Sequence, residues 1–201
     1  LIKVDERLNI AYTLFTGDFL RAFPKVGDDN DKWLNVKEAV ELLIANDSQK
    51  IKELMPDACI GVDVIVGFPG ETEEEFMKTV DFLKDLDISY LHVFTYSERA
   101  NTTAKKMADS VPLNIRRERS RQLQILSEKK KRQFYTTQIG KEKPALFEAE
   151  ENEGTIFGFT NNYVKVKLPY DKSLVNQIVP VQLSEIDRDG VVKVKIGARV
   201  S

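Results

Sequence analysis

Cysteine is nearly absent from this 201-residue sequence, which contains one cysteine, one histidine and one tryptophan. A single cysteine excludes an internal disulfide and is typical of a reducing compartment, so we expect a cytoplasmic protein. Long apolar runs are also missing: no stretch approaches the roughly 18 residues that a membrane-spanning helix needs. The first residues carry charges where a signal peptide would have an apolar core. These features exclude disulfide scaffolds and predict a soluble protein with no membrane partner.

The two scarce reactive side chains stand in apolar surroundings. Cys59 lies within a predicted strand, which favours a small buried side chain over a nucleophile. His92 stands between apolar neighbours with no second ligand type nearby, which favours a hydrogen-bonded histidine at the edge of a core over a metal ligand. We therefore predict neither a metal site nor a catalytic residue from these two positions.

The most informative pattern present is a strand, a glycine turn and a helix over residues 57–76. Small and β-branched residues predict a buried strand that ends at Val66. A turn follows from Gly67 to Gly70, and Thr72 and Glu75 have the spacing of a helix capping box. Ligands of α/β sheets bind where strands end, so we expect a backbone-lined pocket beside Gly67. A tight turn that binds nothing is the alternative, and this pattern by itself leaves both open.

Basic residues concentrate between residues 111 and 143. This stretch contains ten basic and three acidic residues, a net charge of +7 within a chain whose net charge is −2. Such asymmetry is typical of a face that meets a polyanion. A solvated helix face is the alternative, and the charge pattern does not decide between them.

Periodicity divides the chain into three parts: a partly helical segment at 1–48, an α/β part at 49–139 and a β part at 140–201. Helices are expected at 34–45 and 48–55, the second ending before Pro56. A helix to about Leu86, a second buried strand at 90–96 and a long basic helix at 113–138 complete the α/β part. The inward residues expected on that long helix are Leu123, Ile125, Leu126 and Phe134.

From residue 143 onward the hydrophobic period changes to two. Strands are predicted at 145–149, 155–159, 163–168, 179–183 and 191–196. Five short strands predict a small antiparallel barrel that closes its own edges. A basic, aromatic-rich barrel of this kind suits nucleic-acid binding, through phosphate contacts and base stacking, and a β-domain that only packs against the rest is the alternative.

At this point the sequence resembles a known family. The segments GVDVIVGFPGETEEEF and LHVFTYSERANTTAKKM, followed by a basic helix and a β-barrel, are similar to the C-terminal half of radical S-adenosylmethionine tRNA methylthiotransferases. The resemblance is strongest to the branch that acts on N6-threonylcarbamoyladenosine next to the anticodon. It implies an α/β fold: an incomplete (β/α) barrel of the radical S-adenosylmethionine type, then a small antiparallel OB-like barrel, the TRAM domain.

The resemblance also implies site residues. The cofactor would be S-adenosyl-L-methionine, and the residues implied beside it are Asp63, Ile65, Gly67, Phe94, Ser97 and Arg99. Phe94 would contact the adenine, whereas Ser97 and Arg99 match the rim element YSxR; the Gly-Thr pair usual after it reads Asn101-Thr102 here. The partner would be tRNA, at its anticodon stem-loop. Residues expected to contact RNA are Arg116, Arg117, Lys129, Lys130, Lys141, Lys143, Asn162, Tyr163, Lys165 and Lys167.

One departure from the family concerns its [4Fe–4S] clusters, which are held by two sets of three cysteines. Cys59 matches neither set, so this chain lacks the cluster ligands and is expected to be inactive alone. Residues 1 to about 48 do not match the family. Two hypotheses follow: a fragment of a tRNA-modifying enzyme, or an RNA-binding module without activity of its own. A truncated barrel would expose a strand edge and favour self-association, unless residues 1–48 cover that edge.

Overall fold

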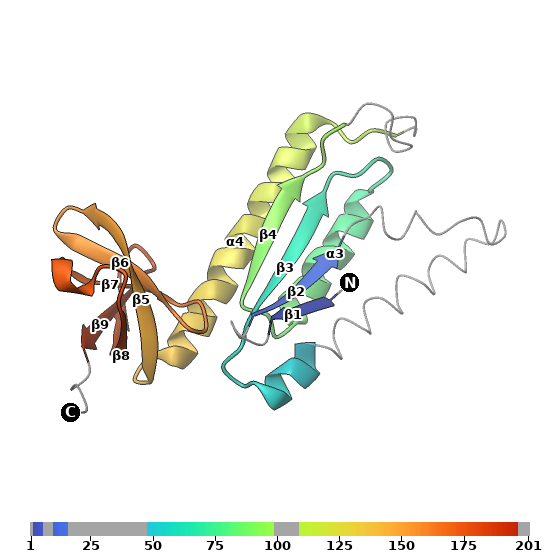
Figure 1. The fold of residues 1–201 in the computed structure, drawn as a ribbon. Helices are drawn as coiled ribbons and strands as arrows, with labels where there is room; N and C mark the ends of the chain where they lie inside the picture. Colours follow the sequence, from blue (N-terminus) through green and yellow to red (C-terminus); the bar gives the residue numbers. More distant parts are fainter. Residues whose placement is uncertain (1, 6–9, 16–47, 99–108, 197–201) are drawn as a thin grey trace. The chain divides into compact units, whose positions relative to one another are not determined.

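The computed structural model describes residues 2–5, 10–15, 48–98 and 109–196 (Figure 1). The expected helix at 34–45 and the residues Arg99, Asn101 and Thr102 lie outside this part. Residues 48–54 are helical, as predicted. The elements are β1 (Ile2–Asp5), β2 (Ile10–Phe15), β3 (Cys59–Val66), α3 (Glu73–Asp85), β4 (Tyr90–Thr95), α4 (Leu113–Gln138), β5 (Glu142–Asn152), β6 (Thr155–Thr160), β7 (Lys165–Pro169), the short 3-10 helix η2 (Lys172–Leu174), β8 (Ile178–Ile186) and β9 (Val192–Ile196).

The chain packs into two units. The first, the α/β unit, includes residues 60–130 and therefore β4, α3 and the larger part of α4. The second, the barrel unit, includes residues 57–59 and 131–201, and therefore the last two turns of α4 and strands β5 to β9. The division falls within α4, between Lys130 and Lys131, whereas the sequence predicted a boundary after residue 139.

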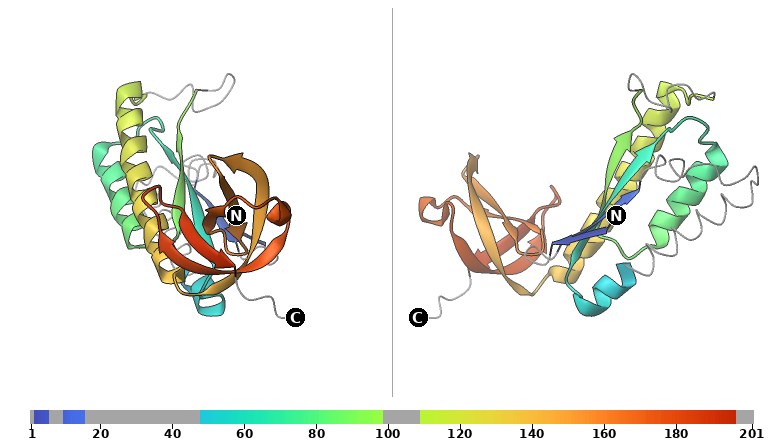
Figure 2. Two further views of the ribbon diagram at one scale, coloured as in Figure 1. Left: turned by 90° about the vertical axis from the view of Figure 1, so that its left-hand side faces the viewer. Right: turned by 45° about the vertical axis from the view of Figure 1, so that its right-hand side comes forward.

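The α/β unit is built on a sheet with the order β1-β2-β3-β4. Strands β3 and β4 are parallel, with Val62 opposite Leu91 and Val64 opposite Val93. Helices α3 and α4 cover one face of this sheet (Figure 2). Because β2 lies next to β3, residues from the first 48 cover the edge that the truncated barrel was expected to expose.

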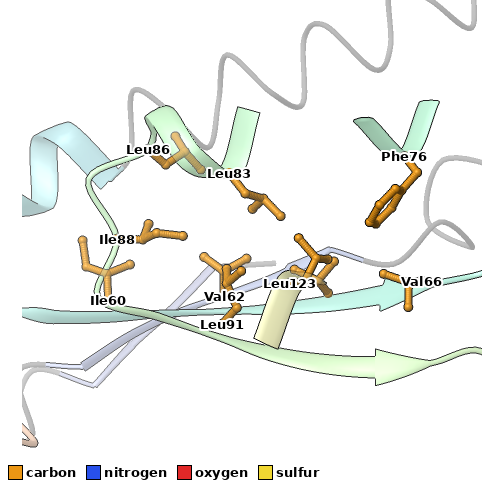
Figure 3. Packing of buried hydrophobic residues seen from close by; sticks show 10 residues of the cluster. Ile60, Val62, Val66, Phe76, Leu83, Leu86, Ile88, Leu91 and Leu123 are labelled. Carbon is orange, nitrogen blue, oxygen red and sulfur yellow. The ribbon is translucent and has the colours of Figure 1, made fainter. Parts of the chain in front are cut away.

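Alternate residues of β3 form the core under these helices. Ile60, Val62 and Val66 point from β3 towards α3 and α4 (Figure 3). They pack against Phe76 and Leu83 of α3 and against Leu123 of α4, all of which are almost fully buried. This arrangement confirms the interior strand and the inward position of Leu123. Ile125, expected to point inward, is 49% exposed, because two residues along a helix correspond to a turn of about 200°.

Both ends of α3 are satisfied by side chains. The Thr72 hydroxyl accepts from the Glu75 backbone N–H at 3.2 Å, and the Glu75 carboxylate accepts from the Thr72 backbone N–H at 3.0 Å. This is the predicted capping box, and three glutamates in the first turn complement the helix dipole. At the other end, the Lys130 ammonium donates to the carbonyls of Lys84 at 3.0 Å and Leu86 at 2.7 Å.

Strands β5 to β9 close into a barrel with the order β5-β6-β7-β9-β8. The five strands agree with the prediction, except that the barrel is not wholly antiparallel: β7 and β9 pair in parallel, with Val166 opposite Val192. A ring with an odd number of strands cannot alternate direction all the way round, so at least one neighbouring pair must be parallel. Closure leaves no unpaired edge in the ring.

No helix in the described residues has the length and apolar character needed to cross a membrane.

Candidate functional site

The face of β3 and β4 that α3 and α4 leave uncovered carries the predicted cofactor residues. Register places Asp63 opposite His92 and Ile65 opposite Phe94, so these four side chains share one face. Phe94 is 52% exposed, which is unusual for a large aromatic side chain on a sheet. The structure therefore brings Asp63, Ile65 and Phe94 together, as the resemblance implies. We call this surface the open face.

Aromatic packing shapes the other end of the open face. The ring of Tyr90 lies against Gly61, where any side chain would collide with it. His92 is exposed and meets the Tyr90 ring edge-on, with centroids 4.9 Å apart. His92 was predicted at the edge of a core; it is exposed instead, because register turns it away from the buried side of β4.

The turn at the C-terminal end of β3 depends on Gly67. Its φ is +78°, in the region that glycine tolerates, and a side chain there would collide with Arg116. The Gly67 N–H donates to the carboxylate of Glu71. The backbone N–H of this turn is thus already satisfied from within the chain.

Glu71 is in turn bound by Arg119. The guanidinium donates to the Glu71 carboxylate at 3.1 Å and backbone carbonyl at 3.0 Å, and to Glu73 at 3.0 Å. Burial raises the pKa of Glu71, and the Gly67 N–H and Arg119 oppose that rise only in part. These contacts fasten the turn after β3 to α4.

Tyr96, just after β4, presents a polar atom at the same end of the sheet. Its ring packs edge-on against Phe68, with centroids 5.2 Å apart, and Ile65 of the open face packs against both. The Tyr96 hydroxyl is buried and has no hydrogen-bond partner in the described part of the chain. A buried hydroxyl without a partner is unusual in a folded protein. Ser97, the predicted rim residue, is exposed beside it.

Arg116, expected to contact RNA, is 5% exposed and has structural partners. Its guanidinium donates to the carbonyls of Val111 at 2.7 Å and Tyr96 at 2.9 Å. It also donates to the Ser110 hydroxyl at 2.9 Å and to the Glu98 carboxylate at 2.5 Å. This geometry assigns Arg116 to holding the two ends of the 97–110 segment, and does not favour contact with RNA.

The other predicted RNA contacts on α4 divide in the same way. Lys130 is 7% exposed, and burial lowers its pKa while its ammonium binds the end of α3. Arg117 and Lys129, each directly next to a buried cation in the sequence, are exposed. Only the exposed pair is free to meet a phosphate backbone.

In the barrel unit, Lys141 and Lys143 converge on one carboxylate. Their ammonium groups lie 2.5 Å and 2.6 Å from the two carboxylate oxygens of Asp57. These two hydrogen bonds lower the pKa of Asp57 to about 2. The two lysines are therefore compensated by an acid of the same unit.

Asn162, another predicted RNA contact, is buried in a polar network. Its amide donates to the Asp57 carbonyl and to Gln138, both at 3.0 Å, and its oxygen accepts from the Thr160 hydroxyl at 2.7 Å. Tyr163, which follows it, is 45% exposed. Asn162 therefore supports the turn from inside while Tyr163 faces outward.

The predicted lysines of β7 differ in their partners. Lys167 lies 2.7 Å from Asp187 and 3.4 Å from Asp189, and these acids raise its pKa. Lys165 is exposed and lies over the ring of Phe157, with its ammonium 5.2 Å from the centroid. Lys165 is in no ion pair within the described residues.

Searches with family models gave no match to this chain. Individual proteins do match. The chain is 39% identical over 138 residues to the threonylcarbamoyladenosine tRNA methylthiotransferase MtaB of Bacillus subtilis, covering 67% of this chain and 31% of that protein. MtaB of Aquifex aeolicus is 46% identical over 117 residues, 58% of this chain and 27% of that protein. The tRNA-2-methylthio-N(6)-dimethylallyladenosine synthase of Symbiobacterium thermophilum is 38% identical over 136 residues, 67% and 29% respectively.

The chain is homologous to part of the tRNA methylthiotransferases. It spans about a third of the length of these relatives. The match of 138 residues is longer than either continuous run, 60–130 or 131–201, so it includes residues of both units. The family resemblance inferred from the two motifs is confirmed.

In this methylthiotransferase homologue the residues do not fit an iron–sulfur cluster. Cys59 is buried in β3. Within the described part of the chain, no three His, Cys, Asp or Glu side chains gather closely enough to hold a metal ion.

Three structural residues were missed from the sequence: Asp57, Glu71 and Arg119. Each is an ordinary charged residue in a chain that is 31% charged, so composition gave no reason to select it. The nearest signal was the position of Glu71 directly after the glycine turn. Its partner Arg119 lies 48 residues away, and no local pattern reports such a pairing.

Proposed function

We propose that the chain is the portion of a tRNA-modifying enzyme that supplies part of the S-adenosylmethionine site and binds the tRNA. The enzyme would methylthiolate carbon 2 of N6-threonylcarbamoyladenosine next to the anticodon. The observation that carries this proposal is the 39% identity to MtaB over 138 residues, which include residues of both units. The relatives named for threonylcarbamoyladenosine include the 46% match, whereas those named for dimethylallyladenosine are 31–38% identical.

The open face has the chemistry of a wall for S-adenosylmethionine. Phe94 offers an exposed ring for the adenine, Ile65 an apolar neighbour and Asp63 a carboxylate acceptor for hydroxyl groups. The Tyr96 hydroxyl, which is buried and has no hydrogen-bond partner in the described part of the chain, adds a polar atom at that end of the sheet. When bound, S-adenosylmethionine supplies the methyl group. The residues of this chain bind and orient it, and the turn at Gly67 bounds one end of the site.

The RNA contacts of the proposal are narrower than the sequence predicted. Arg117, Lys129 and Lys165 are exposed and free to meet phosphates, and Tyr163 presents a ring two residues before Lys165. Acids of this chain already bind Lys141, Lys143 and Lys167. RNA phosphates would have to compete with these acids for the three lysines. Binding should therefore depend on salt, with a slope set by a few cations.

The test of this function is the nucleoside content of tRNA. Deleting the gene that encodes this sequence should abolish 2-methylthio-N6-threonylcarbamoyladenosine and leave N6-threonylcarbamoyladenosine in its place, as measured by mass spectrometry of digested tRNA. Wild-type complementation should restore the product, whereas the Phe94→Ala gene should restore less. Loss of the dimethylallyl product instead would assign the gene to the other branch. Persistence of both products would contradict the enzymatic proposal.

A second function, an RNA-binding module without activity, is favoured by the single buried cysteine. In that case both modified nucleosides persist in the deletion strain. The purified chain would still bind an anticodon stem-loop, with affinity that falls as salt rises.

A further inference from the structure

A row of outward side chains crosses four strands of the barrel. Leu146 of β5 lies opposite Ile178 of β8 and opposite Phe159 of β6, and Phe159 lies opposite Lys165 of β7. Ile178 is 70% exposed and Leu146 46% exposed, and Phe159 is half-buried. Because opposite residues of paired strands share one face, these four side chains form a continuous surface, which we call the stacking row.

Tyr163 extends the stacking row with a second ring. Its ring centroid lies 5.0 Å from that of Phe159, and the two planes are inclined by 31°. Tyr163 is 45% exposed, so the pair presents aromatic surface to solvent. Two rings at this separation and inclination resemble an offset stack that a third planar group can join.

The backbone of Tyr163 is strained to hold this position. Its φ is +65°, a left-handed conformation that is uncommon for a bulky side chain. The Tyr163 N–H donates to the Thr160 carbonyl at 2.9 Å, which closes a tight turn. Strain of this kind persists where the surroundings over-determine it, and it concentrates at functional sites.

Buried polar contacts supply that over-determination. Asn162 is 1% exposed and joins Thr160, Gln138 and the Asp57 carbonyl by hydrogen bonds of 2.7–3.0 Å. The Thr160 hydroxyl also accepts from the Val164 N–H at 2.9 Å. These hydrogen bonds hold the turn on its buried side and leave the Tyr163 ring exposed.

The charge beside the row is selective. On β7 and β9, Lys167 and Lys193 are paired with Asp187 and Glu185. Lys165, at the end of the row, has no acid partner within the described residues, and its ammonium lies over Phe157. Lys165 thus places a positive charge beside the aromatic surface of the row. A ligand that contacts both needs a planar group and a negative charge.

We infer that the stacking row binds unpaired nucleotides of RNA, with a base stacked on Tyr163 and Phe159 and a phosphate held by Lys165. This rests on the proposed tRNA-binding function and adds to it a chemical class of target: single-stranded rather than duplex RNA. Base-on-aromatic stacking tolerates any sequence, because every base has a planar face. A shallow hollow lined by Pro144, Ile178 and Pro180 continues the row and leaves room for a neighbouring nucleotide.

The test uses the full chain and a fluorescently labelled RNA of seven unpaired nucleotides. Tyr163→Gly removes the ring and also relieves the left-handed strain, so the variant should fold at least as well as the wild type. Anisotropy titrations should show affinity for the single strand weakened by about 5- to 150-fold, with an unchanged salt slope. Lys165→Gln should instead reduce the slope of log affinity against log salt by about 0.7.

Tyr170→Ala is the matched control. Tyr170 is 37% exposed and follows the other end of β7, so its loss removes a comparable ring away from the row. Its affinity should match the wild type. If the wild type binds RNA and Tyr163→Gly binds it equally tightly, the stacking row is overturned. The tRNA-binding proposal is then unaffected. Tighter binding to a duplex of the same sequence also overturns the inference.

Two further outcomes are decisive. If the wild type dimerises with rising concentration and Tyr163→Gly does not, the row is a contact with a second copy, and the inference fails. If the wild type binds no RNA at all, both the inference and the RNA-binding part of the proposed function fail. The nucleoside measurement in the deletion strain reports separately on the enzymatic part.

Discussion

The carboxylate of Glu71 joins parts of the α/β unit that lie far apart in sequence. It accepts from the Gly67 N–H, four residues before it, and from Arg119 of α4. Burial nevertheless outweighs these partners and raises the pKa of Glu71. A raised pKa in an acid means that the folded protein binds the proton more tightly than the unfolded chain does.

Replacement of Glu71 should therefore depend on what replaces it. Glu71→Gln keeps a hydrogen-bonding side chain without the buried charge and should raise the unfolding free energy modestly at pH 7. Glu71→Ala leaves the Gly67 N–H and Arg119 without their acceptor and should cost about 1–3 kcal/mol. Urea unfolding followed by circular dichroism measures both. A Gln variant as unstable as the Ala variant would contradict the explanation.

The pH dependence of the same variants gives a second check. Because the folded pKa lies above 4.5, wild-type stability should fall as pH rises from 4.5 through the folded pKa. Glu71→Gln should lack this decline, so the difference between the two proteins should narrow towards pH 4. A constant difference across this range would rule out Glu71 as the titrating group.

The basic residues of helix α4 have two different roles. Its inward cations Arg116, Arg119 and Lys130 bind carbonyls and acids of the same unit, whereas Arg117 and Lys129 face solvent. The sequence correctly located the helix and its excess charge. It could not separate the two groups, because the acids that bind Arg116 and Arg119 lie 18 to 48 residues away.

Adjacent lysines of α4 offer a matched comparison. Lys130→Met fills the same space but leaves the carbonyls of Lys84 and Leu86 without their donor, and should lower the unfolding free energy by about 1–3 kcal/mol. Lys129→Met removes the same charge from an exposed position and should change it by less than about 0.5 kcal/mol. Thermal unfolding of the two variants under the same conditions measures this difference. Equal effects would mean that Lys130 does not stabilise the end of α3.

The sequence predicted the features that depend on contacts between residues close in sequence, and it missed those that depend on distant residues. The capping box of Thr72 and Glu75 and the alternation of β3 are local, so both were predicted. The barrel strands were found for the same reason. The parallel pairing of β7 with β9 was missed, since Val166 and Val192 meet only when the ring closes. Phe94 was identified through the family motif, whereas Asp57 lies outside both quoted motifs and Glu71 lies within the first without an implied role.

Across the whole chain, much of the apparent positive field is cancelled internally. Among the ten basic residues between positions 111 and 143, Arg116, Arg119, Lys141 and Lys143 are paired with acids. The surface available to a polyanion is therefore smaller than the net charge of +7 suggests. Asp57 alone compensates two of these cations.

Asp57→Asn should therefore change two properties in opposite directions. RNA affinity should rise, because Lys141 and Lys143 are released to bind phosphates. The slope of log affinity against log salt should steepen by the equivalent of up to about two phosphate contacts. Stability should fall modestly: Asp57 is 38% exposed, so each ion pair contributes no more than about 1 kcal/mol. Glu148→Gln removes the same charge from an exposed position of β5 and should have a smaller effect on both.

The pH profile of Asp57→Asn is also specified. A pKa of about 2 in the folded protein, below the ordinary value of 3.8, contributes stability above pH 3.8 that is lost as pH falls through 2. The difference between wild type and variant should therefore vanish in strong acid. Chemical denaturation between pH 2 and pH 7 measures it, and a difference that grows on acidification would contradict the pairing.

The order in which the barrel strands pair has a consequence for synthesis on the ribosome. β9 is the last strand of the ring, and it bridges β7 and β8. Until Val192–Ile196 leaves the exit tunnel, β7 and β8 each keep an unpaired edge, whereas β3 and β4 emerge more than 90 residues earlier. The nascent chain should thus display open strand edges until β9 emerges, which makes the synthesis of residues 170–196 an interval exposed to aggregation and dependent on chaperones.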